Sequence, residues 1–351
     1  MNFNQELLKK NKNAEICSVY MAADDIRKNL QDNKNHCRSI ALKIFEYKPE
    51  RLLFIGSGAS YCTLYTPWYF MNTTSDIPSI LMRGPELIAA GTEFVKGKRT
   101  YAILSSYSGK TADTVEAAGY LKNLGVPLVA LSKSDQNPLV KICEDVISYN
   151  SKCLYTSAMA NMLMVMAELQ ILYGEKQLAN HLMTALEKLP DQMTGIIKKS
   201  EQIALETLEL LKDDEFIYVL GDGPLWGLTY QYGYTNLMEY SRIHAACLPA
   251  AEWRHGPLEI MFRNPAMIIL MGNDCGRKYV EATASYCKKR GARVAIFDVK
   301  DYLDTHPVLA PFVLHAVAQL FILYYTTYKN IDLDEYLEMH IHPYVEDENY
   351  F

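Results

Sequence analysis

The sequence lacks several patterns that would place it in a protein class at once. Its 351 residues contain 8 cysteines but no C-x-x-C pair, so neither a zinc knuckle nor a thioredoxin-type motif is readable. It has no Lys/Arg-rich run and its formal net charge is −6, whereas nucleic-acid binders carry a basic footprint. A single pocket can oppose the global charge, so a small anionic ligand remains compatible with this composition.

Export and membrane signals are also missing. The N-terminal stretch MNFNQELLKKNKNAE is polar, unlike a secretory signal. The most apolar stretch, FVLHAVAQLFILYYTTY, is interrupted by His and Gln and is short for a bilayer span. Hydrophobic residues make up 49% of the chain and charged residues 22%, as in globular proteins. These features predict a reduced, cytoplasmic protein of one or two domains, with no membrane and no nucleic acid as partner.

An internal repeat is the main organising feature. RLLFIGSGASYCTLYTPWYFMN and EFIYVLGDGPLWGLTYQYGYTNLMEY each pass from an apolar run through Gly-x-Gly into an aromatic helical pattern. A second short strand and a turn follow each, in IPSILMRGPEL and IHAACLPAAEW. Pairing Gly56 with Gly221 gives an offset of 165 residues, and pairing Glu86 with Glu252 gives 166. Strands that alternate with helical segments predict two copies of one α/β unit, each a parallel sheet with helices on both faces.

The repeat also sets the predicted domain boundaries. Residues 1–34 are expected to form an N-terminal helical segment, residues 35–195 the first unit and residues 196–351 the second. The stretch that joins the copies, GEKQLANHLMTALEKLPDQMTGIIKKSEQIALETLELLKDD, has Leu and Ile at helical spacing and predicts a pair of amphipathic helices. The Met-rich SAMANMLMVMAELQILYG predicts a buried helix. Ligands of such sheets bind at the carboxyl ends of the strands.

A candidate phosphate loop follows the strand YAIL, in SSYSGKTADT. The unpaired N–H groups of a helix N-terminus favour an anion, and the hydroxyls of Ser106, Ser108 and Thr111 add donors. Lys110 supplies a positive charge, and Ser60 is a further donor from the GSGAS loop. The loop is not a Walker A sequence, so a phosphomonoester is expected rather than a nucleoside triphosphate. Such hydroxyls also serve as helix caps. The corresponding stretch of the second copy, MGNDCGRK, lacks the hydroxyl cluster. Since a capping role would be needed in both copies, this difference favours a ligand role.

GSGAS, SSYSGKTADT and EWRHGPLE together resemble the sugar isomerase (SIS) family in its double-domain form, in which each domain is a flavodoxin-like parallel sheet. Within it, the resemblance is closest to phosphorylated-ketosamine deglycases of the fructoselysine-6-phosphate type, and extends to the isomerase half of glucosamine-6-phosphate synthase. It implies that the serine–threonine loop holds a sugar 6-phosphate, supported by Gly58, Tyr107 and Lys110. It implies no cofactor and no metal.

The resemblance also implies the catalytic residues Glu239, in NLMEYSRIHA, and His255, in HGPL. The histidine is expected to reach the site of the neighbouring subunit in a homodimer. A carboxylate and an imidazole suit the acid–base steps of a C1/C2 proton shift. Alternatively, Glu239 pairs with Arg242 three residues on, and His255 is a turn residue before Gly-Pro. Glu252 is expected to support the site by orienting His255, or to be a turn residue like its counterpart Glu86.

Two departures from the synthase favour the deglycases. The synthase has an N-terminal ammonia-producing domain, but this chain begins MNFNQ and its first family-like strand starts at Arg51, which predicts that this domain is absent. The synthase also uses a lysine near its extreme C-terminus, whereas the last lysine of this chain is Lys329. The expected reaction is cleavage of a phosphorylated ketosamine to glucose 6-phosphate and an amino acid. Open alternatives are an aldose–ketose phosphosugar isomerase, an aminosugar-phosphate deaminase and a non-catalytic sugar-phosphate sensor. His340 and His342 lack a nearby carboxylate or cysteine at ligand-like spacing, so no metal site is predicted.

Overall fold

A computed structural model describes residues 3–338, which form two α/β units. The first unit is Asp24–Lys188, and the second combines the N-terminal residues up to Ala23 with Leu189–Glu335. The sequence predicted boundaries after residues 34 and 195. The structure instead assigns the N-terminal helix to the second unit, for a reason visible in its polar contacts.

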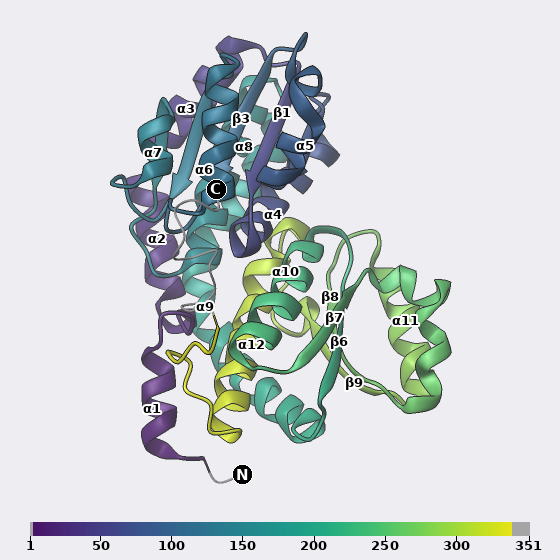
Figure 1. The fold of residues 1–351 in the computed structure, drawn as a ribbon. Coiled ribbons are helices and arrows are strands. Elements are labelled where there is room, and N and C mark those ends of the chain that lie inside the picture. Colours follow the sequence, from purple (N-terminus) through teal and green to yellow (C-terminus); the bar gives the residue numbers. More distant parts are fainter. Residues whose placement is uncertain (1–2, 339–351) are drawn as a thin grey trace. The chain divides into compact units, whose positions relative to one another are not determined.

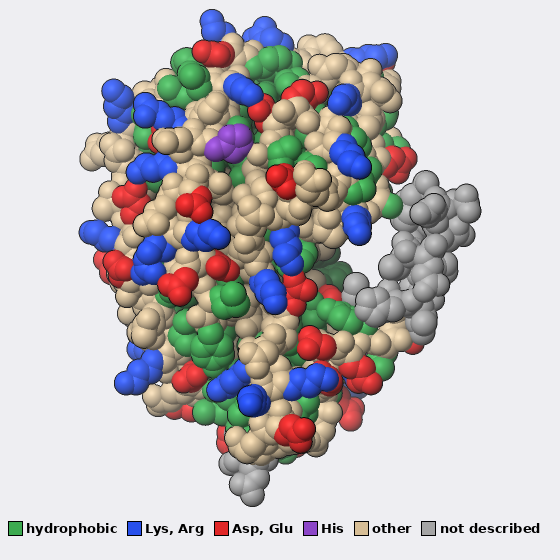
Figure 2. Space-filling model, turned by 90° about the vertical axis from the view of Figure 1, so that its left-hand side faces the viewer, with side chains coloured by type: hydrophobic (Ala, Val, Ile, Leu, Met, Phe, Trp, Pro, Cys, Tyr) green, Lys and Arg blue, Asp and Glu red, His purple; other side chains and the backbone are tan. Residues whose placement is uncertain are grey.

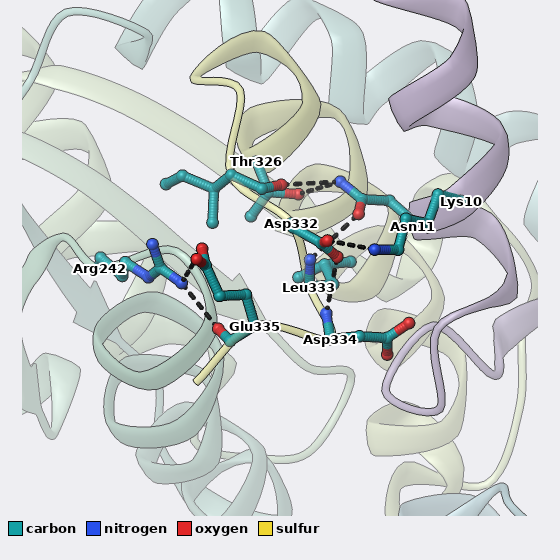
Figure 3. A network of polar contacts seen from close by, with 9 residues as sticks. Lys10, Asn11, Arg242, Thr326, Asp332, Leu333, Asp334 and Glu335 are labelled. Carbon is teal, nitrogen blue, oxygen red and sulfur yellow. Dashed lines mark hydrogen bonds and ion pairs between the residues drawn. The ribbon is translucent and has the colours of Figure 1, made fainter. Parts of the chain in front are cut away.

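The N-terminal helix α1 (Gln5–Asn13) is bonded to the end of α12 (Ala310–Tyr328) and to the segment that follows it (Figure 3). The buried amide of Asn11 donates to the hydroxyl of Thr326 at 3.4 Å and accepts the N–H of Leu333 at 3.1 Å. Lys10 pairs with Asp332 beside it. A buried amide needs its partners, so these bonds hold the start of the chain in the second unit.

The first unit contains a five-stranded parallel sheet in the order β2-β1-β3-β4-β5. This is the flavodoxin-like order that the sequence predicted. The central strands β1, β3 and β4 are buried at every residue, because helices cover both faces of the sheet (Figure 1). The strands are β1 Arg51–Gly56, β2 Ser79–Met82, β3 Thr100–Ser105, β4 Leu128–Ser132 and β5 Asp145–Ser148.

Helices of the first unit pack on this sheet through alternate strand residues. On one face, Leu53 and Leu104 share a hydrophobic core with Leu87 of α5 and Leu121 of α6. The Met-rich segment forms α8, which is buried along most of its length, as predicted. The helices are α2 Ala22–Asp32, α3 Lys34–Tyr47, α4 Gly58–Thr74, α5 Gly84–Val95, α6 Ala112–Asn123, α7 Pro138–Ile142 and α8 Leu154–Leu172.

The second unit repeats this topology. Its parallel sheet has the order β7-β6-β8-β9, which corresponds strand for strand to β2-β1-β3-β4. The predicted internal repeat is therefore confirmed in the strand order. The strands are β6 Phe216–Leu220, β7 His244–Leu248, β8 Ala266–Met271 and β9 Arg293–Asp298. His244, at the start of β7, is exposed.

Around the second sheet, regular helices alternate with short segments. The α-helices are α10 Trp226–Gln231, α11 Arg277–Lys289 and α12 Ala310–Tyr328, and η3 Tyr232–Tyr240 is a π-helix. The 3₁₀ segments are η1 Val19–Met21, η2 Gly223–Leu225, η4 Ala250–His255, η5 Pro257–Arg263, η6 Val299–Asp301 and η7 Pro307–Leu309.

Helix α12 forms the centre of the second unit's core. The stretch Pro307–Tyr328 is long and apolar enough to cross a membrane, but its whole apolar window is buried inside the structure. This is the environment of a core helix. Burial also lowers the pKa of His315 to about 3, so its imidazole is neutral there.

The segment that joins the two copies is a single 36-residue helix, α9 Lys176–Leu211, so the prediction of two helices was wrong. Pro190 lies inside it. A proline removes one backbone N–H and crowds the preceding turn, but the helical spacing of leucine and isoleucine continues on both sides of it. The apolar stripe therefore keeps the helix continuous.

Charges of both signs are interspersed over the face shown in Figure 2. Lysine and arginine side chains alternate with aspartate and glutamate across it, with hydrophobic groups between them. This mixture agrees with the small net charge of −6.

Candidate active site

The loop between β3 and α6 has a backbone shape that only glycine permits at its centre. Gly109 has φ of +64°, and a Cβ there would lie 1.9 Å from Oδ1 of Asn137. Thr111 occupies the N-cap position of α6, but its side chain makes no capping hydrogen bond. The first N–H groups of a helix have no partner within the helix. Because the hydroxyl of Thr111 does not cap them, they stay available to an anion.

Hydroxyl groups from two loops meet at this helix end. Ser106 Oγ lies 2.9 Å from Thr111 Oγ1 and accepts the N–H of Gly109 at 3.1 Å. Ser60, in the first turn of α4, accepts the N–H of Tyr107 at 3.2 Å. The first unit therefore brings together three of the predicted donors, although they come from two different strand–helix loops.

The remaining predicted residues of this loop line its outer side. Ser108 and Lys110 are both exposed, and Ser108 Oγ accepts the N–H of Lys110 at 3.1 Å. Gly58 opens α4 with φ of +53°, a conformation that favours glycine. A phosphate at the helix end would thus contact the exposed Lys110 and exposed hydroxyls, and this side of the site is open to solvent.

Lys133 is a member of this cluster that the sequence reading missed. Its N–H donates to the carbonyl oxygen of Tyr107 at 3.2 Å, and its Nζ lies 4.6 Å from the centre of the Tyr107 ring. It directly follows β4, the neighbour of β3 in the sheet. A lysine immediately after a parallel strand was the available signal, because such residues gather at the carboxyl edge where ligands bind.

The equivalent loop of the second unit carries its own negative charge. Asp274 accepts the N–H of Gly276 at 2.8 Å, and a Cβ on Gly272 would lie 2.7 Å from its Oδ2. Arg277, the first residue of α11, makes two bonds to Asp298 at 2.7 and 2.5 Å. The Asp274 carboxylate thus takes up a backbone N–H just before α11, whereas Asp113, in the first turn of α6, accepts the hydroxyl of Ser57 at 2.6 Å. This contrast supports the prediction that only the first copy holds phosphate.

Glu239 lies near the end of the π-helix η3 and is partly buried. Burial raises the pKa of its carboxyl from 4.5 to about 7, although a hydrogen bond with Tyr240 opposes the shift. Arg242 is not its partner: the guanidinium donates to Glu335 at the backbone oxygen, 2.7 Å away, and at Oε2, 3.2 Å away (Figure 3). The predicted alternative of an ordinary helix-surface pair is therefore wrong.

His255 ends the 3₁₀ segment η4 and is exposed. Arg254 donates its Nε–H to His255 Nε2 at 3.2 Å. In a neutral ring this acceptor role leaves the proton on Nδ1. Trp253 is buried and packs edge-on to Tyr218 with ring centroids 5.3 Å apart, which anchors the segment that presents the histidine. Glu252 is exposed on the same segment.

Glu239 and His255 flank opposite ends of β7, an edge strand of the second sheet. Glu239 comes just before β7, which starts at His244, and His255 comes shortly after β7 ends at Leu248. A strand advances about 3.3 Å per residue, so β7 alone separates its two ends by more than about 10 Å. The whole of β7 therefore lies between the two members of the predicted acid–base pair along the chain.

The first unit identifies the fold family. Residues 47–169 match the SIS domain family, and this stretch contains both hydroxyl-bearing loops. This segment is a SIS domain. The SIS resemblance predicted from the sequence motifs is thus confirmed, and the second unit has the same strand order as the SIS domain.

Proteins with printed functions are similar to this chain over most of its length. The chain is similar to the fructoselysine 6-phosphate deglycase of Escherichia coli K12, with 25% identity over 82% of this chain and 84% of that protein. It is similar to the fructosamine deglycase FrlB of Bacillus subtilis, with 26% identity over 76% and 84%. The solved C-terminal domain of glucosamine-fructose-6-phosphate aminotransferase from Francisella tularensis superposes with a TM-score of 0.80 at 19% identity, covering 92% and 98%.

These comparisons support a SIS phosphosugar-processing enzyme. They do not test the individual site residues, whose roles remain predictions. The metal question raised by His340 and His342 lies outside the described residues. Within residues 3–338, no group of three or more His, Cys, Asp or Glu side chains is placed to hold a metal ion.

Proposed function

We propose that this SIS-domain protein is a deglycase that cleaves a phosphorylated ketosamine to glucose 6-phosphate and a free amino acid. The observation that carries the proposal is the carboxyl of Glu239, whose pKa is raised to about 7 by burial. A general base works best when its pKa lies near the working pH. The similarity to two deglycases supports the choice of substrate class.

The chemistry follows from the position of the double bond. A ketosamine has its amine on C1 and a ketone at C2, so water cannot hydrolyse the C1–N bond directly. Glu239 takes a proton from C1 while a proton is added to the C2 oxygen, which yields an enaminol. A proton is then added to C2 as the nitrogen gives up its own. The product has a C1=N double bond that water hydrolyses to an aldose phosphate and an amine. No electrons are exchanged with a cofactor in this sequence.

His255 moves protons at the sugar oxygens or at the departing nitrogen. Because β7 separates Glu239 from His255 along the chain, we propose that the histidine of a second copy completes each site. A homodimer of this kind has two equivalent sites, each built from both chains. The phosphate is held by Ser60, Ser106, Ser108 and Thr111, with Lys110 and Lys133 nearby.

A sugar-phosphate sensor would need the hydroxyl loop but no desolvated carboxyl. Holding a glutamate in a partly buried place costs stability at neutral pH. That cost is expected where a functional proton transfer requires it. An isomerase uses the same C1/C2 shift with oxygen in place of nitrogen, so it is the alternative that the experiment must separate.

The test offers purified protein a panel of fructosyl-amino acid 6-phosphates and follows glucose 6-phosphate with a coupled dehydrogenase. We expect release of glucose 6-phosphate from at least one member. The matching unphosphorylated ketosamines should turn over far more slowly, because the hydroxyl loop then has no ligand. Conversion of fructose 6-phosphate with no cleavage of any ketosamine would show that the protein is an isomerase.

A further inference from the structure

The internal repeat supplies a control for one glutamate of the candidate site. In the first unit, Glu86 at the third position of α5 accepts the N–H of Arg83 at 2.7 Å and pairs with its guanidinium at 2.8 Å. This arrangement is a capping box that closes the start of α5. Glu86 therefore has a structural role that its bonds fully explain.

The equivalent glutamate of the second unit, Glu252, has lost that role. The residue that corresponds to Arg83 is Pro249, which has no N–H to donate. The start of η4 is held in another way, because the N–H of Ala251 donates to Asp222 at 2.9 Å. The carboxylate of Glu252 is thus retained at a position where it no longer caps a helix.

Glu252 and His255 are presented on the same side of η4. Side chains three residues apart eclipse one another along a 3₁₀-helix, and both residues are exposed. The nearby cation Arg254 is bonded to His255. Among residues 3–338, the structure shows no ion pair to Glu252. A binding site that contains His255 would therefore also contain the carboxylate of Glu252, with no cation paired to it.

We propose that Glu252 binds the ammonium nitrogen on C1 of the substrate, an inference that rests on the deglycase function. A ketosamine phosphate carries a positive secondary ammonium at neutral pH, whereas a plain sugar phosphate carries none. The phosphate loop recognises the end that both molecules share. A carboxylate next to the acid–base histidine distinguishes them through a charge-assisted hydrogen bond. Glu252 is therefore the residue that selects aminated over plain sugar phosphates.

The experiment measures binding in a Glu239→Gln background, so that the ketosamine is not consumed. Calorimetry compares a fructosyl-amino acid 6-phosphate with fructose 6-phosphate. Adding Glu252→Gln should weaken binding of the ketosamine about tenfold or more, because hydrogen bonds to charged groups are strong, and should leave fructose 6-phosphate unchanged. Adding Glu86→Gln, the matched control in the first unit, should leave both affinities unchanged while lowering the melting temperature.

Equal weakening of both ligands, or of neither, would overturn the role of Glu252. The inference is also wrong if Glu239→Gln alone binds the ketosamine no more tightly than fructose 6-phosphate. Failure of the deglycase function would be seen separately, as the absence of glucose 6-phosphate when wild-type protein meets the ketosamine panel. The role of Glu252 is therefore tested by ligand binding to variants, and the deglycase function is tested by turnover with the wild-type protein.

Discussion

The raised pKa of Glu239 predicts that this residue lowers the stability of the protein as the pH rises. Its pKa is 4.5 when solvated and about 7 in the folded chain, so the folded state binds the proton more tightly. Burial of Glu239 therefore does not lower the free energy of unfolding below pH 4.5, and it lowers this free energy increasingly as the pH rises to 7. One pKa unit corresponds to 1.36 kcal/mol, which gives about 3 kcal/mol at most. Partial solvent exposure reduces this to about 2 kcal/mol.

The assay compares melting temperatures of wild type and Glu239→Gln between pH 4.5 and 8.5. The glutamine cannot ionise, so the variant should melt about 4–8 °C higher than wild type at pH 8 and nearly together with it at pH 4.5. The same variant should lose turnover, because an amide cannot accept the C1 proton. Glu46→Gln, at an exposed glutamate of α3, is the matched control and should show no such trend. A difference that stays constant across this pH range would refute the reasoning.

Three further predictions concern the shared site, the phosphate loop and the second unit. Equal mixing of Glu239→Gln and His255→Ala subunits should restore about a quarter of wild-type activity through mixed dimers, and no recovery after subunit exchange would contradict the shared site. Ser106→Ala should raise KM for the sugar phosphate about tenfold and weaken inhibition by inorganic phosphate; unchanged values would place the phosphate elsewhere. Arg277→Ala should cost about 2–3 kcal/mol in urea unfolding, because it leaves the partly buried Asp298 unpaired, whereas an unchanged midpoint would show that the pair contributes little.

The hydroxyl-rich loop between β3 and α6 could be found from the sequence because its signals are local. Hydroxyls between a strand and a helix, with Gly109 at the turn, form a contiguous pattern, and the altered second copy showed that the pattern is not required by the fold. Lys133 was missed because it is distant in sequence from Ser106. Lys133 reaches the neighbour of Ser106, Tyr107, only because β3 and β4 are neighbours in the sheet.

The partners of charged side chains were the least predictable feature. Arg242 was an obvious helical neighbour for Glu239, yet it bonds Glu335, far along the chain. The first helix likewise belongs to the second unit because Asn11 bonds to Thr326 and Leu333. Helical spacing limits which residues can meet but does not choose among distant competitors.

The sequence by itself determined the architecture: two copies of a parallel α/β unit, with a hydroxyl-rich loop in one copy and a histidine beside Gly-Pro in the other. Hydrophobic periodicity and turn residues encode these features, and both act over short stretches of chain. The tertiary structure alone decided the surroundings of the candidate site residues. Desolvation, which raises the pKa of Glu239, depends on what packs around the carboxyl. The contact between Lys133 and Tyr107 depends on how the strands align, which no local pattern records.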